Sequence, residues 1–79
     1  MSRSDLILAA PLFLATIPDI TPADALDDAR QIASLCARQD NPEYRHTIFF
    51  AACILLAHDQ TLSPQDAITT ATELWLAAR

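Results

Sequence analysis

Few side chains in this sequence are of the types that carry catalysis, and their spacing does not assemble a site. His46 and His58 fall at opposite ends of one predicted helix, about 18 Å apart along its axis, so one chain cannot use both for a metal ion. Cys36 and Cys53 lie on successive helices with an axial offset of about 9 Å, which exceeds the reach of a disulfide. Ser63 has no base at motif spacing. We expect no catalytic residue, no metal ligand, no cofactor and no enzymatic activity.

Composition points instead to a protein-binding role. The chain has 79 residues, of which 52% are apolar and 19% are charged, and its net charge is -5. An acidic protein does not bind the phosphates of nucleic acid directly, so a charged partner should be a basic protein. The apolar excess is large for a single small domain, which predicts that a partner or a second copy, as in a homodimer, covers part of it.

The compartment is inferred from the apolar runs and the cysteines. The apolar run at 6–15 recurs in mid-chain at 48–57, where no signal peptide can act, and neither run reaches the roughly 18 to 20 residues that span a bilayer. Two cysteines make no disulfide framework. We expect a soluble, cytoplasmic protein that does not contact a membrane.

An internal repeat organises the elements that position these residues. Residues 6–29 are repeated without a gap by residues 48–71, at a period of 42. Repeats of this length mark a supersecondary unit that packs on its own copy. The sequence predicts one domain over 1–79, with a first repeat at about 4–39 and a second at about 42–79.

The repeats are predicted to be helical hairpins. Thr21-Pro22, Asn41-Pro42 and Ser63-Pro64 each combine an N-cap residue with a proline at the first helical position. We expect helices from Ser2 or Ser4 to about residue 16 and at about 22–39, 42–58 and 64–78, with a kink or a late start at Pro11. No segment alternates as a strand does.

Two such hairpins predict an all-α fold. Short connections favour a compact four-helix antiparallel bundle built from the two duplicated hairpins, with pseudo-twofold symmetry. Both loops within the repeats should then lie at one end of the bundle.

Charge is expected to be polarised along this bundle. The predicted partner-binding residues at the acidic end are Asp19, Asp24, Asp27, Asp28 and Asp59, and Asp66 lies with them. The opposite end should collect Arg3, Arg38, Arg45 and Arg79. Helix capping accounts for Asp24 and Asp66. A solvated acidic surface that serves only solubility competes with the binding interpretation.

Small size, acidity, an all-helical pattern and the aspartates at this end make the chain similar to small inhibitors of nucleic-acid enzymes. It resembles the anti-CRISPR proteins of phages and the immunity proteins of DNase bacteriocins, at the level of class and without a shared motif. The resemblance implies non-catalytic inhibition, in which the aspartates occupy the basic groove of a nucleic-acid-processing complex and electrostatics speeds association.

Two other functions remain open. A helical adaptor or homo-oligomerisation module would use an apolar interface at Phe49, Phe50 and Trp75, and its period of 42 is similar to that of HEAT and armadillo repeats. An enzymatic function would rest on His58 and Asp59 alone.

Overall fold

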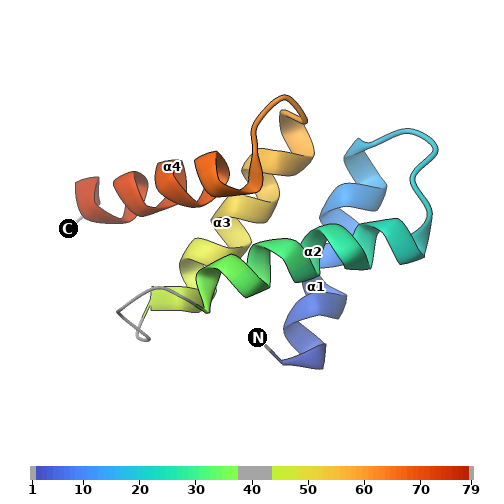
Figure 1. Cartoon of the computed structure of the whole chain (residues 1–79), viewed down its shortest axis with the longest axis horizontal. Helices are drawn as coiled ribbons and strands as arrows, with labels where there is room; N and C mark the ends of the chain where they lie inside the picture. Colours follow the sequence, from blue (N-terminus) through green and yellow to red (C-terminus); the bar gives the residue numbers. More distant parts are fainter. Residues whose placement is uncertain (1, 38–43, 79) are drawn as a thin grey trace.

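A computed structural model describes residues 2–37 and 44–78 of the chain (Figure 1). These residues form four helices: α1 (Arg3–Thr16), α2 (Pro22–Cys36), α3 (Arg45–His58) and α4 (Pro64–Ala77). The described segments contain no strand. The prediction of an all-α, four-helix fold built from two hairpins is confirmed.

The 42-residue period of the sequence is also the period of the structure. Helices α3 and α4 each begin 42 residues after α1 and α2, and α3 ends 42 residues after α1. The caps match as well, because Thr21 and Ser63 accept hydrogen bonds from the backbone N–H groups of Asp24 and Asp66, with proline at the first helical position. The N-terminal signals at these two helices were therefore correctly interpreted.

The starts of α1 and α3 compare differently with the prediction. Helix α1 begins at Arg3, directly after Ser2 as expected, and it continues through Pro11, so the alternative of a late start there is wrong. Its early start is stabilised by a capping box between Ser2 and Asp5. Helix α3 begins at Arg45, and its N-cap Tyr44 makes no side-chain capping bond. The Asn41-Pro42 pair, on which the predicted start of α3 rests, lies outside the described residues.

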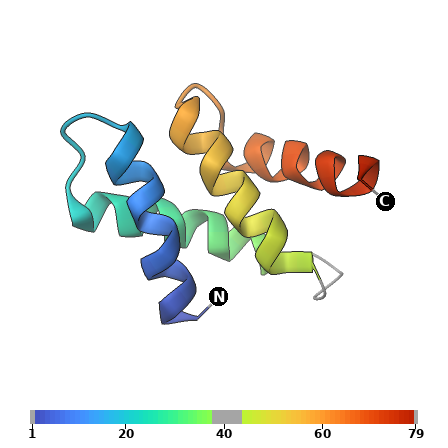
Figure 2. The ribbon, with the colours of Figure 1, turned by 180° about the vertical axis from the view of Figure 1, so that it is seen from behind.

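The helices form two layers, with α1 and α3 in one and α2 and α4 crossing them in the other (Figures 1 and 2). The molecule measures 36 × 25 × 17 Å, and its least dimension accommodates two helices packed about 8–10 Å apart. Corresponding helices of the two repeats run in the same direction (Figure 1). The second hairpin is therefore displaced from the first along the layers.

This stacking corrects the expected pseudo-twofold symmetry. A twofold axis would exchange the hairpins, so that a contact between α2 and α3 would require an equal contact between α4 and α1. Helix α2 does pack on α3, but no contact joins α1 and α4 within the described helices. The repeats are therefore related head to tail. Helix α3 packs on the first repeat with one of its faces, and α1 packs on the second repeat with a different face.

The core lies between the two layers and draws on all four helices. Phe13 and Phe49 are its largest members, and the alanines allow the helices to approach closely. The buried residues are Ala9, Ala10, Phe13, Ala25, Ala29, Ile32, Cys36, Ile48, Phe49, Ala52, Cys53, Ala57, Ala67, Ile68 and Ala71. In the described segments, no helix combines the length and the apolarity that crossing a membrane requires.

Candidate functional site

A cleft of about 210 Å³ opens between the two repeats. Its apolar wall comes from the end of α1, from α3 and from the first residue of α4, and its polar groups are a carboxylate and two amides. The lining residues are Phe13, Ile17, Asp28, Gln31, Leu56, Gln60 and Pro64. Both loops within the repeats border this cleft, since Ile17 belongs to one and Gln60 to the other. The expectation that the two loops share one end of the molecule is confirmed (Figure 1).

Asp28 is the ionisable group of the cleft. Its side chain is half-buried on α2 and makes no hydrogen bond or ion pair with another described residue. Burial raises its pKa, and repulsion from Asp24 and Asp27 raises it further. Partial burial and two neighbouring carboxylates thus disfavour the charged form of Asp28.

Asp19 and Asp59 lie in the two loops and have folding roles. Asp19 adopts a left-handed backbone with φ 65°, a conformation that aspartate tolerates better than most residues in a chain without glycine. Asp59 ends α3 and accepts hydrogen bonds from the backbone N–H and the hydroxyl of Thr61. These bonds lower its pKa. Asp59 therefore has a structural role, because its side chain accepts the hydrogen bonds that close this turn.

The remaining predicted acids lie on the first two turns of α2. Asp24 is exposed and its backbone N–H bonds to the N-cap. Asp27 is exposed and forms an ion pair with Arg30 at 3.1 Å, so part of its charge is compensated locally. Of the five predicted partner-binding acids, Asp28 is the one that lines the cleft.

The opposite, basic end is only partly described. Arg3 is exposed at the start of α1, and Arg45 is half-buried at the start of α3. Arg38 and Arg79 lie outside the described residues. The predicted cluster of four arginines stays a prediction.

The structure differs from the prediction most at the alternative apolar interface. Phe49 is fully buried and contacts Phe50 edge to face, with ring centroids 5.0 Å apart. Trp75 is half-buried and stacks on Tyr44 at 4.9 Å. A partner cannot reach Phe49 without opening the core, so the prediction that Phe49 belongs to an apolar interface is wrong. Phe50 and Trp75 are partly exposed, and their part in such an interface stays a prediction. The helical spacing of Phe49 in the sequence reflects a position in the core.

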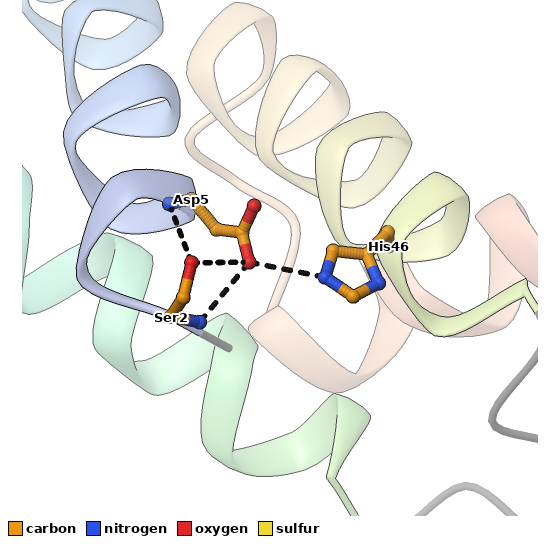
Figure 3. Close-up of polar contacts among 3 residues, drawn as sticks. All are labelled: Ser2, Asp5 and His46. Atoms are coloured by element: carbon orange, nitrogen blue, oxygen red, sulfur yellow. Dashed lines mark hydrogen bonds and ion pairs between the residues drawn. The ribbon is translucent and has the colours of Figure 1, made fainter.

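His46 has a partner that the sequence did not indicate. Its Nε2 lies 3.0 Å from Asp5 Oδ2, which also accepts bonds from the backbone N–H and the hydroxyl of Ser2 (Figure 3). The cluster joins α1 to α3 across the two repeats. The histidine is largely exposed, as expected, but its role is to connect the hairpins.

The two cysteines behave as core residues. Cys36 and Cys53 are free and fully buried, in agreement with the expected absence of a disulfide between them. Burial raises the pKa of Cys53 to about 12, with smaller contributions from Cys36 and Asp28. Such thiols are poor nucleophiles near neutral pH. Among residues 2–37 and 44–78, no three His, Cys, Asp or Glu side chains are grouped to hold a metal ion.

The sequence did not mark the cleft itself. Gln31 and Gln60 belong to different repeats, and their meeting depends on how the hairpins stack. One signal was present, since the second copy has Thr70 where the first has Asp28, and Gln60 where the first has Pro18. Comparison of the chain with protein-family models, with curated proteins and with solved structures gave no match, so any function must be argued from this site.

Proposed function

We propose that this protein is a small, non-catalytic inhibitor that docks its cleft and the surrounding aspartates on a basic surface of a nucleic-acid-processing complex. The observation that carries the proposal is Asp28, a half-buried carboxylate without a described partner on the wall of an open cleft. The class-level resemblance to anti-CRISPR and immunity proteins agrees with it.

The cleft has the chemistry to accept one long basic side chain. Phe13, Ile17 and Leu56 offer an apolar wall for the methylene groups of an arginine or lysine, whose charged head would meet Asp28. The amides of Gln31 and Gln60 can accept further hydrogen bonds from a guanidinium. A cation bound there would relieve the repulsion among Asp24, Asp27 and Asp28.

The surrounding acids would act at longer range. Asp19, Asp24 and Asp59 are exposed at the same end of the molecule and would steer a basic partner toward the cleft. Binding should therefore be fast and should weaken with salt, because exposed charges are screened.

The proposal is tested by titrating the ¹⁵N-labelled protein with an arginine-rich peptide at low and high salt. We expect shifts at the amides of Gln31 and Gln60, and we expect Asp28→Asn to abolish them. Glu73→Gln changes the net charge equally at an exposed site outside the cleft and should bind nearly as well as the wild type.

Stability supplies a second readout for the same variant. Because folding raises the pKa of Asp28, ionised Asp28 opposes folding once the pH is above its folded pKa. Asp28→Asn should then raise the free energy of unfolding at neutral pH while it abolishes binding. Unchanged peptide affinity in Asp28→Asn would contradict the proposal.

A further inference from the structure

The exposed apolar residues of α1 occupy positions that are buried in the second repeat. Ile7 and Leu14 are 54% and 41% exposed, whereas their counterparts 42 residues later are the buried Phe49 and the half-buried Leu56. Pro11 and Ala15 are also exposed, and their counterparts Cys53 and Ala57 are buried. We name Ile7, Pro11, Leu14 and Ala15 the leading face.

The counterparts of the leading face pack on the preceding repeat. Leu56 shares the cleft with Phe13 and Asp28 of the first repeat. Cys53 lies close enough to Cys36 for the two thiols to interact electrostatically. Within the described residues, no repeat covers the leading face as the first repeat covers its counterparts.

The far end of the molecule shows the converse. Ile54 and Leu74 are 44% and 54% exposed, whereas their counterparts in the first repeat are the half-buried Leu12 and the fully buried Ile32. Ala78 is exposed where Cys36 is buried. We name Ile54, Leu74 and Ala78 the trailing face, and within the described residues no repeat covers it.

Both faces stay apolar although solvent reaches them. Some other outward positions of the repeats carry polar residues in both copies, such as Asp27 with Thr69, while Leu8 and Leu76 are exposed apolar residues outside the two faces. Exposed isoleucine and leucine at interface positions thus indicate surfaces that are covered in the working state.

We infer that copies of this chain associate head to tail, with the leading face of one copy packed on the trailing face of the next. The packing between the two repeats provides the template, because each exposed face repeats the apolar pattern of a surface that already has its partner inside the chain. We therefore propose a second copy of the chain as the partner of each face. The packing of one repeat on the other already shows that the two kinds of surface are complementary.

The geometry determines the kind of assembly. The two faces differ, so the contact is heterologous and extends to open oligomers, while a closed twofold dimer would use one face twice. The ion pair between the repeats has no equivalent at the new junction, where the positions of Asp5 and His46 are taken by Thr47 and Ser4, so the contact rests on the apolar faces. Assembly should therefore persist at high salt, unlike docking through the acidic cleft.

Sedimentation velocity over a wide range of concentrations tests this inference. The wild type should form a series of growing oligomers. Leu14→Glu blocks the leading face and Leu74→Glu the trailing face, and each should weaken self-association by at least about tenfold, because the contact would bury an unpaired carboxylate. Leu76→Glu is the matched control. Leu76 is 51% exposed, its counterpart Ser34 is exposed too, and its variant should assemble as the wild type does.

Mixing the two blocked variants distinguishes head-to-tail contact from the alternatives. Each variant keeps one intact face, so the mixture should form a heterodimer and nothing larger. A wild type that stays monomeric at every concentration would overturn the inference. So would a mixture without heterodimer, a Leu74→Glu variant that still dimerises fully, or loss of assembly in Leu76→Glu. Circular dichroism of each variant checks that these surface changes leave the helices folded.

Discussion

At the scale of single residues, Asp5 combines two roles that are usually separate. Its carboxylate completes the capping box of α1 and also bonds His46 of the other repeat, so one side chain stabilises both a helix end and the contact between hairpins (Figure 3). The counterpart of Asp5 in the second repeat is Thr47, which cannot supply a carboxylate. The repeat therefore does not generate a second cluster of this kind from Thr47.

The cluster predicts a particular response to acid. The bonds from the backbone N–H and hydroxyl of Ser2, with a smaller contribution from His46, lower the pKa of Asp5. Its stabilising effect is therefore complete above the ordinary aspartate pKa and is lost as the pH falls from about 4 through the lowered value. Thermal melts across this range should show Asp5→Asn less stable than wild type at pH 6 and less sensitive to acid. His46→Gln keeps the capping box, so its melts should retain most of the acid dependence; an acid response identical in wild type and Asp5→Asn would contradict this account.

At the scale of helices, Pro11 is the residue that its element least favours. It lies in the interior of α1, where it supplies no N–H to the preceding turn, while Cys53 occupies the same place in α3. Pro22 and Pro64 instead occupy the first position of their helices, where a missing N–H costs nothing. The same residue type is thus unfavourable in one context and favourable in another.

Replacing these prolines by alanine separates the two contexts. Pro11→Ala should raise the free energy of unfolding, by up to about 3 kcal/mol, because alanine restores a hydrogen bond in the helix interior. Pro22→Ala should give no gain. Urea denaturation of both variants provides the measurement, and a Pro11→Ala variant no more stable than wild type would show that the surroundings of α1 have adapted to the proline.

Local chemistry made most of the elements predictable. The starts of α2 and α4 follow from a cap followed by proline, since these contacts involve residues at most three apart. The turn at Asp59 is equally local, because the bonds that form it come from Thr61, two residues away. These bonds were not predicted, because an aspartate at a helix C-terminus was interpreted by its charge alone. The cleft and the stacking of the hairpins were beyond such reasoning. They depend on which face of α3 packs on the first repeat, and the even apolarity of α3 leaves that face unmarked in the sequence.

At the scale of the whole molecule, the head-to-tail stacking divides equivalent residues into those that find a partner repeat and those that do not. Ile32 and Leu74 show the contrast most directly. They occupy the same position of the repeat, but Ile32 is fully buried on α2, which packs on both helices of the second hairpin, and Leu74 is half exposed at the end of the stack. From the repeat alone, both side chains would be expected to contribute equally to the free energy of unfolding. The stacking of the hairpins predicts that Ile32 contributes much more than Leu74.

Truncating each side chain measures that difference. In the monomer, Ile32→Ala should cost about 2–5 kcal/mol of unfolding free energy, through lost burial and the cavity left behind. Leu74→Ala should cost about 0.5 kcal/mol or less, as surface changes usually do. Ile32→Val, expected to cost about 0.5–1.5 kcal/mol, keeps the measurement possible if the alanine variant fails to fold. The monomer values come from urea denaturation at high dilution.

If copies stack as inferred, the cost of Leu74→Ala should grow with protein concentration, because the next copy then buries this side chain. Equal costs for Ile32→Ala and Leu74→Ala at high dilution would contradict the stacking of the hairpins.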